Sequence, residues 1–351
     1  MSYNYEEIIP FLLNWFDYNA RILAWRENPK PYYVWVSEIM LQQTRVEAVK
    51  GYFDRFTCAL PDVKALAEAD EERLLKLWEG LGYYNRVRNL QKAAIKIMDE
   101  YQGEIPGDYE KLLNLPGIGT YTAGAIASIA FQIPVPVVDG NVLRVTKRIS
   151  CSFDDITKDS VKKELWQDLY NIMPSDRPGD FNQSLMELGA TVCLPNGKPL
   201  CDKCPVMHLC KAFKEDKIMQ LPVKPQKKER RIEERTILLI EYQEKFTLHK
   251  RLKKGLLSGL WELPGVDSKL KAEETIDHLK EMGFELVEIT PLGEAKHIFS
   301  HVEWHMIGYH VKASKLDLLR MKEKEFILAN KEEIDEKYSI PNAFSTYIKQ
   351  I

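Results

Sequence analysis

The chain has 351 residues, of which 45% are hydrophobic and 29% are charged. This composition is ordinary for a globular protein, and the length indicates two or three domains rather than one core. The formal charge of −3 argues against a general polyanion binder. It does not exclude an enzyme that contacts phosphates through local patches.

Neither a membrane protein nor a secreted one is expected. No apolar run approaches the roughly 20 residues that span a bilayer. The amino terminus carries Glu6 and Glu7 and has no basic segment, so it does not resemble a secretory signal.

Residues 1–213 are predicted to be mostly helical, because apolar residues recur there at three- and four-residue spacing. Proline and glycine keep these helices short. The clearest predicted helices cover residues 68–80, 87–101, 109–115, 120–131 and 161–173.

The remaining chain has a different pattern. Residues 214–234 alternate basic and acidic side chains with few apolar ones, which indicates an exposed linker. Beyond it the pattern predicts a small α+β module. Its predicted strands cover 236–242, 246–250, 284–290, 296–299 and 302–311, and its predicted helices 272–282 and 331–337.

Four cysteines lie close together at Cys193, Cys201, Cys204 and Cys210. Seven, two and five residues separate them. In a chain without an export signal, this crowding indicates a metal site rather than disulfides. Four thiolates suit either tetrahedral zinc or a [4Fe–4S] cluster, and the spacing alone does not choose between them.

The segment LPGIGT (115–120) separates two predicted helices. Glycine at Gly117 and Gly119 leaves backbone N–H groups exposed at the start of a helix, where a phosphate can bind. A turn of this kind is by itself only a weak indication of nucleic-acid binding.

Two carboxylates are candidates for catalysis. Asp139 precedes a helix predicted to run through Ser150, where it is either a simple N-cap or a catalytic carboxylate kept ionised by helix amides. Glu38 follows Ser37, a predicted N-cap, and is either a glutamate favoured in the first turn of a helix or a catalytic acid. For Glu38, position alone favours the first interpretation.

With these motifs, the chain resembles the helix–hairpin–helix glycosylase superfamily, and specifically its adenine DNA glycosylases. The resemblance covers nearly the whole length. It is carried by the cysteines and by WVSEIMLQQT (35–44), GLGYYNR (80–86), LPGIGTYTAG (115–124), VVDGNV (137–142) and NQSLMELG (182–189).

The resemblance implies a fold class: a multidomain chain with an all-α glycosylase core followed by a Nudix-like α+β domain. Residues 25–131 would form a six-helix domain, and residues 1–24 with 132–213 a cluster domain. The linker at 214–234 would lead to a recognition domain at 235–351. One [4Fe–4S] cluster is implied rather than zinc, although the first cysteine gap is seven residues where the family has six.

One position separates the relatives. Glycosylases that also cut the strand carry a lysine two residues after the second hairpin glycine, and that amine forms a Schiff base with the sugar. Here the position is Tyr121. A phenol cannot form an imine, so we expect a monofunctional enzyme with little or no lyase activity.

The carboxyl-terminal module resembles a Nudix fold through WELPG (261–265). Its segment 270–283 lacks the glutamate-rich helix that binds magnesium in Nudix hydrolases. We therefore expect a module that binds rather than hydrolyses. Adenine glycosylases read 8-oxoguanine through a Phe-Ser-His element, which matches Phe299, Ser300 and His301.

The resemblance also implies roles for individual residues. Glu38 would protonate the flipped adenine and Asp139 would stabilise the sugar cation, with Tyr121 and Asn141 orienting Asp139 and a water molecule. The adenine pocket would be formed by Arg26, Leu41 and Gln183. The residues that contact the DNA or the lesion would be Gln43, Thr44, Tyr83, Gly117, Gly119, Phe299, Ser300 and His301. For Leu41 and Tyr83, core packing is the alternative.

The implied substrate is adenine paired with 8-oxoguanine, or with guanine, in duplex DNA. We expect a monomer that acts on DNA in the cytoplasm, with the linker as a candidate contact for other repair proteins. Three alternatives stay open: a bifunctional pyrimidine glycosylase–lyase, a non-catalytic DNA-damage or clamp-associated binding protein, and a nucleotide pyrophosphatase.

Overall fold

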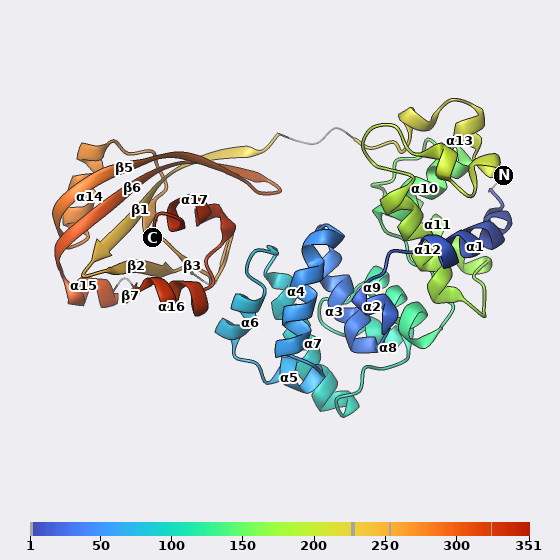
Figure 1. Ribbon diagram of the computed structural model, residues 1–351, viewed down its shortest axis with the longest axis horizontal. Helices are drawn as coiled ribbons and strands as arrows, with labels where there is room; N and C mark the ends of the chain where they lie inside the picture. Colours follow the sequence, from blue (N-terminus) through green and yellow to red (C-terminus); the bar gives the residue numbers. More distant parts are fainter. Residues whose placement is uncertain (1–2, 226–228, 253, 324) are drawn as a thin grey trace. The chain divides into compact units, whose positions relative to one another are not determined.

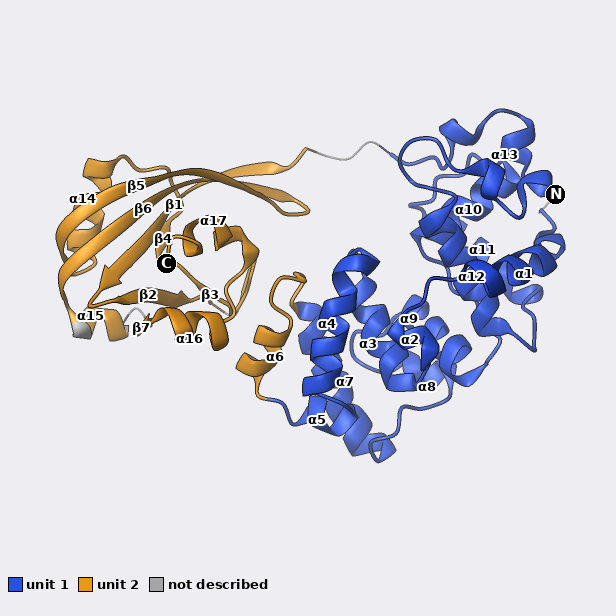
Figure 2. Ribbon diagram, viewed as in Figure 1, with its two compact units in different colours: residues 1–69, 85–226 blue, residues 70–84, 227–351 orange. Residues whose placement is uncertain are grey.

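The structure, a computed structural model, describes residues 3–225, 229–252, 254–323 and 325–351. The chain forms two compact units (Figure 2). The first contains Met1–Ala69 and Asn85–Gln226, and the second contains Asp70–Tyr84 and Lys227–Ile351. Among the described residues, none of the helices is long and apolar enough to cross a membrane.

The first unit is helical (Figure 1). One group of helices precedes residue 132: α2 (Ala24–Glu27), α3 (Pro31–Leu41), α4 (Val46–Ala59), α5 (Val63–Ala67), α7 (Asn85–Tyr101), α8 (Tyr109–Leu113), α9 (Thr120–Ala125) and the π-helical turn η2 (Ile126–Ala130). A second group combines the amino terminus with later residues: η1 (Tyr5–Ile8), α1 (Ile9–Asn19), α10 (Gly140–Ser150), α11 (Asp159–Asn171), α12 (Pro178–Thr191), η3 (Cys201–Lys203), η4 (Met207–Leu209), α13 (Lys211–Lys214) and η5 (Ile218–Gln220).

The second group packs around one apolar core to which both ends of the segment contribute. Ile8 and Leu12, from the amino terminus, are buried with Phe181 and Leu185 of α12. The hydroxyl of Tyr5 donates to the Thr146 carbonyl of α10 over 3.3 Å. The amino-terminal helices are therefore packed against residues more than a hundred positions later in the chain.

Helix α3 corrects one expectation from the sequence. It begins at Pro31 and ends at Leu41, so Ser37 and Glu38 lie near its carboxyl end rather than in a first turn. The predicted N-cap at Ser37 is wrong: its hydroxyl donates to the Val34 carbonyl within the helix. Proline at the first helical position sets the true start instead.

The second unit is an α+β module built on a mixed sheet in the order β3-β2-β1-β6-β5. The pair β1–β6 is parallel, and the pairs β3–β2, β2–β1 and β6–β5 are antiparallel. Its elements are α6 (Glu71–Leu77), β1 (Arg231–Tyr242), β2 (Lys245–Lys250), β3 (Trp261–Glu262), β4 (Gly265–Val266), α14 (Ala272–Glu281), β5 (Phe284–Ile298), β6 (Val302–Leu316), α15 (Leu318–Glu323), β7 (Phe326–Ala329), α16 (Lys331–Glu336), η6 (Asn342–Phe344) and α17 (Ser345–Ile348).

Two features of this sheet differ from the prediction. Strand β1 already begins at Arg231, inside the expected linker, because it pairs with β6 along its whole length. The two strands expected at 284–290 and 296–299 are one long strand, β5, which pairs with β6 across three register shifts. Residues 299–301 form the turn between β5 and β6 (Figure 1), as expected.

Candidate active site

A single pocket in the first unit collects eight of the residues singled out from the sequence. They come from segments spread over more than 150 positions of the chain, which shows that the fold and not the local sequence gathers them. The eight are Arg26, Glu38, Leu41, Thr44, Tyr121, Asp139, Asn141 and Gln183.

Glu38 is a buried acid on α3. Its Oε2 accepts a hydrogen bond from the Tyr121 hydroxyl over 2.5 Å. Burial raises the pKa of Glu38 to about 7, and the negative charge of Asp139 adds to the rise, while the Tyr121 hydrogen bond lowers it. A carboxylic acid that holds its proton near neutral pH can act as a general acid.

Asp139 is the N-cap of α10, as predicted. Its Oδ1 accepts from the backbone N–H groups of Asn141 and Val142 at 2.8 and 2.7 Å, and its Oδ2 accepts from the Asn141 side chain at 2.7 Å. Burial nevertheless raises the pKa of Asp139 above its ordinary value, against the lowering by these donors. The sequence led us to expect a net lowering, and burial reverses its sign.

Tyr121 and Asn141 each form a hydrogen bond with a different carboxylate of the pocket. The resemblance implied that Tyr121 orients Asp139, yet its hydroxyl donates to Glu38. Asn141 contacts Asp139 and in turn accepts from Arg144 at 2.9 Å. Arg144 also donates to the Cys193 carbonyl at 2.8 Å, so one side chain touches both the Asp139 helix and the cysteine segment.

Sequence reasoning missed the other charged residues of the pocket, Arg21 and Glu187. The side chain of Glu187 is fully buried and accepts from Arg21 at 2.6 and 2.9 Å and from Arg26 at 2.8 Å. Burial alone would raise the pKa of Glu187, but the two arginines hold it below its ordinary value. Arg26 also donates to Gln183 at 3.0 Å.

A signal for Glu187 was present in the sequence. It lies four residues after Gln183 on α12, and residues at that spacing share one face of a helix. Met186, which also lines the pocket, lies on the same face. A pocket residue at Gln183 therefore pointed to its helical neighbours.

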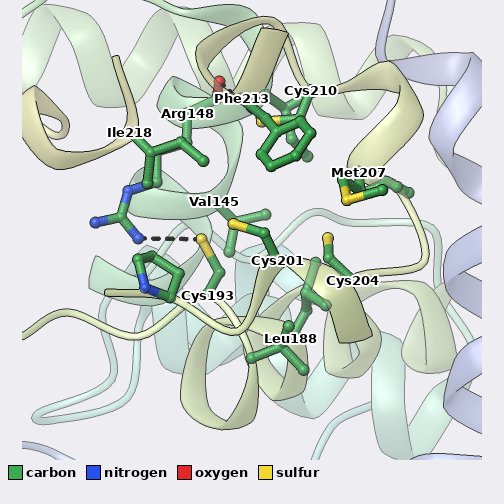
Figure 3. A pocket seen from close by; sticks show the side chains of 14 residues that line it. Val145, Arg148, Leu188, Cys193, Cys201, Cys204, Met207, Cys210, Phe213 and Ile218 are labelled. Atoms are coloured by element: carbon green, nitrogen blue, oxygen red, sulfur yellow. Dashed lines mark hydrogen bonds between the residues drawn. The ribbon is translucent and has the colours of Figure 1, made fainter. Parts of the chain in front are cut away.

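The four clustered cysteines line a second pocket, with mainly apolar neighbours such as Val145, Leu188 and Phe213 (Figure 3). Across the described ranges of the chain, no three or more His, Cys, Asp or Glu side chains gather as they would around a single metal ion.

The chemistry of the four sulfurs fits a positively charged group. Burial raises the pKa of Cys204 to about 12 and of Cys210 to about 11. These two cysteines would therefore stay as neutral thiols unless a bound cation stabilised their thiolate forms. Arg148 donates to the Cys193 sulfur over 3.3 Å (Figure 3).

The hairpin glycines lie outside the acid pocket. Gly117 has a φ of 73°, and a Cβ there would lie 2.6 Å from the Asn89 side chain, so the turn requires glycine. Gly119 is the N-cap of α9 and is exposed, with open space where a Cβ would be. The start of α9 is thus accessible to an anion.

Two of the residues expected to contact the DNA or the lesion share an unusual backbone conformation. Gln43 has a φ of 58° and Tyr83 a φ of 47°. The left-handed region is uncommon for residues other than glycine and is enriched at functional sites. Both residues are exposed.

Tyr83 belongs to the second unit, together with the Phe-Ser-His turn. Its hydroxyl lies 2.7 Å from the Ser300 hydroxyl. Phe299 packs edge-on against Trp304 with ring centroids 4.8 Å apart, while Ser300 and His301 are exposed. The turn therefore anchors one side chain and presents the next two.

Family models match both parts of the chain. One described as an HhH-GPD superfamily base excision DNA repair protein matches residues 36–170, and a NUDIX domain matches residues 235–350. A thermostable thymine-DNA glycosylase superposes with a TM-score of 0.53 at 27% identity, covering 60% of this chain and 97% of that one. Endonuclease III in a non-covalent DNA complex gives 0.52 at 26%, covering 62% and 99%.

The helical fold and its pocket of carboxylates thus define a DNA glycosylase of the HhH-GPD class, a hydrolase of N-glycosyl bonds. Adenine DNA glycosylase of Mus musculus is 37% identical over 366 residues, covering 87% of this chain and 70% of that protein. Its counterpart in Buchnera aphidicola subsp. Schizaphis graminum is 35% identical over 305 residues, covering 86% and 87%. The chain belongs to the adenine DNA glycosylase family and is a base excision repair enzyme for adenine.

Proposed function

We propose that this enzyme removes adenine paired with 8-oxoguanine, or with guanine, from duplex DNA and leaves the strand uncut. One observation carries the proposal: Glu38 and Asp139 line the same pocket, although 101 positions separate them in the sequence. Paired carboxylates, one protonated and one charged, are the usual solution for breaking a glycosidic bond.

The target adenine leaves the base stack before its glycosidic bond can be reached. Glu38 then donates a proton to a ring nitrogen of the base, which makes adenine a better leaving group. The raised pKa of Glu38, about 7, supports this role because a large share of the enzyme carries the proton at neutral pH.

Departure of the base leaves positive charge on the sugar. In its ionised form Asp139 stabilises that cation by charge, or by a transient bond to the anomeric carbon. Asn141 and the amides of α10 fix the carboxylate in one orientation. A water molecule then adds to the sugar carbon and completes the hydrolysis.

Other side chains that line the same pocket hold the purine base. Arg26 and Gln183 are the proposed contacts to the base edge, and Leu41 contacts its face. We add Glu187 to this set, because its buried carboxylate fixes Arg26 at 2.8 Å and accepts hydrogen bonds. A carboxylate there suits the exocyclic amine of adenine and disfavours a carbonyl at that position.

The duplex is held outside this pocket. The exposed amides at Gly117 and Gly119 bind a backbone phosphate at the start of α9. Gln43, Thr44 and Tyr83 contact the bases near the lesion, Tyr83 by inserting its ring. Ser300 and His301, presented by the Phe299 anchor, distinguish 8-oxoguanine from guanine.

The four cysteines are proposed to hold one [4Fe–4S] cluster. When bound, the cluster would supply iron–thiolate bonds that order the segment 193–210. Lys198 and Lys203 of this segment are then available to DNA phosphates. The extra residue in the first gap falls in 194–200, which contains Gly197 in a left-handed conformation and can absorb it.

The test is excision from a duplex with one adenine·8-oxoguanine pair, scored with and without alkali. We expect strand breaks only after alkali and no covalent adduct on borohydride reduction. Glu38→Gln and Asp139→Asn should lose excision by a factor of about 1,000 or more, while binding to a duplex with a non-cleavable adenine analogue persists.

Asp70→Asn is the matched control, because Asp70 caps α6 through two amides as Asp139 caps α10. It should retain activity. Normal excision by Glu38→Gln or Asp139→Asn would refute the proposed roles, and a strong borohydride adduct would favour a glycosylase–lyase.

A further inference from the structure

Residues 132–139, here called the strap, lead from η2 to Asp139 and form no strand, and residues 135–137 of the strap are buried. It follows η2 and contains Pro134 and Pro136, which have no N–H group. Val135 and Val137 are buried. Buried backbone groups need partners, so something other than a sheet must satisfy this strap.

The side-chain amide of Asn182 supplies those partners. Its Oδ1 accepts from the Val137 N–H at 3.0 Å, and its Nδ2 donates to the Val135 carbonyl at 2.9 Å. The second proton of Nδ2 goes to the Ser128 hydroxyl of η2 at 2.8 Å. Asn182 is fully buried and thus replaces the peptide group of a missing neighbouring strand.

Two glycines bring backbones close together around the strap and the turn η2 before it. A Cβ at Gly124 would lie 2.9 Å from the Pro136 carbonyl oxygen. A Cβ at Gly179 of α12 would lie 2.6 Å from the Ser128 carbonyl oxygen. Backbone therefore packs directly on backbone where α9 meets the strap and where α12 meets η2, so a shift of the strap at Pro136 cannot be absorbed by side chains.

The position of Asn182 on α12 links the strap to residues that line the pocket. The adjacent Gln183, and Glu187 farther along α12, line the pocket from one side. Val137 is two residues before Asp139, which lines it too. Asn182 thus ties the base-binding helix to the strap that carries the carboxylate.

We propose that Asn182 is a positioning residue, which sets the separation between the base-contacting face of α12 and the Asp139 carboxylate. The inference rests on the proposed role of Asp139. A displacement of about 1 Å at a reacting group can cost on the order of 100-fold in rate. The effect should therefore fall on the chemical step and not on DNA affinity.

Asn182→Asp keeps the acceptor for Val137 and removes both donors, whereas Asn182→Ala removes every contact. We expect the single-turnover excision rate to fall about 30- to 100-fold in the Asp variant, and further in the Ala variant. Affinity for the non-cleavable duplex should change by less than about threefold. Ser184→Ala is the matched control, since Ser184 is buried on α12 but bonds only to the Phe181 carbonyl.

Hydrogen exchange gives a readout independent of activity. The backbone amides of Val135 and of residues 137–139 should exchange faster in both Asn182 variants, while the helices of the unit stay protected as in the wild type. A rate within about threefold of wild type, an equal loss in Ser184→Ala, or unchanged exchange at 135–139 would each overturn the inference. Full activity of Asp139→Asn would instead remove the proposed function and leave the exchange result standing.

Discussion

The hydroxyl of Tyr121 donates to Oε2 of Glu38 over 2.5 Å. Burial pushes the pKa of Glu38 upward, and this hydrogen bond pulls it back by favouring the carboxylate. Tyr121 therefore lowers the pKa of the proposed acid. Under the proposed mechanism, the balance of these two effects would set the pH range of excision.

The single-turnover rate should fall as pH rises through about 7, because the proposed role of Glu38 as general acid requires its protonated form. Tyr121→Phe removes the interaction that lowers the pKa of Glu38, so its proton is held to higher pH. The descending limb of the pH–rate profile should move to higher pH in this variant. A limb that stays in place or moves to lower pH would contradict the assignment.

Glu38→Gln should stabilise the protein at alkaline pH while it abolishes excision. The folded-state pKa, about 7, lies above the ordinary value of 4.5. Ionising Glu38 in the folded protein thus destabilises it. This loss of stability is absent below pH 4.5 and reaches its full size above pH 7. The cost is on the order of 3 kcal/mol.

Thermal unfolding across this range provides the check. The variant should exceed the wild type in Tm at about pH 8 to 9 and approach it at about pH 4.5. A pH-independent difference between the two proteins would indicate that Glu38 is not held neutral by burial.

Ser300→Ala should reduce the preference for adenine·8-oxoguanine over adenine·guanine about tenfold, the value of one hydrogen bond. Rates on the two duplexes give this ratio. Ser314→Ala, which removes a hydroxyl from β6 that bonds to the Glu285 carbonyl, is the control. Tyr83→Phe removes the partner of Ser300 but keeps the ring, so it should retain most of the preference.

Cys204→Ser should lower the iron and acid-labile sulfide of the purified enzyme and reduce its Tm, because one of the four proposed cluster ligands is lost. Cys58→Ser should change neither, since Cys58 is exposed and lies apart from the four. Wild-type protein without iron and sulfide, or with zinc in their place, would refute the proposed cluster.

Local sequence determined much of the architecture. The proline and glycine pattern around Gly117, the cap at Asp139 and the cysteine spacing depend on near neighbours, and all lie where the sequence indicated. The absence of an amine at Tyr121 is likewise a property of one residue. Such features can be predicted because the backbone conformations and chemistry involved are local.

Tertiary structure decided the properties that depend on burial and on distant partners. The sequence misplaced Glu38 in a helical first turn and gave the pKa of Asp139 the wrong direction, because desolvation exists only in the packed protein. Glu187 and Asn182 owe their importance to contacts with Arg26 and with Val137, 161 and 45 positions away. Helical periodicity can say which face of α12 these residues share, but only the packed core determines what that face meets.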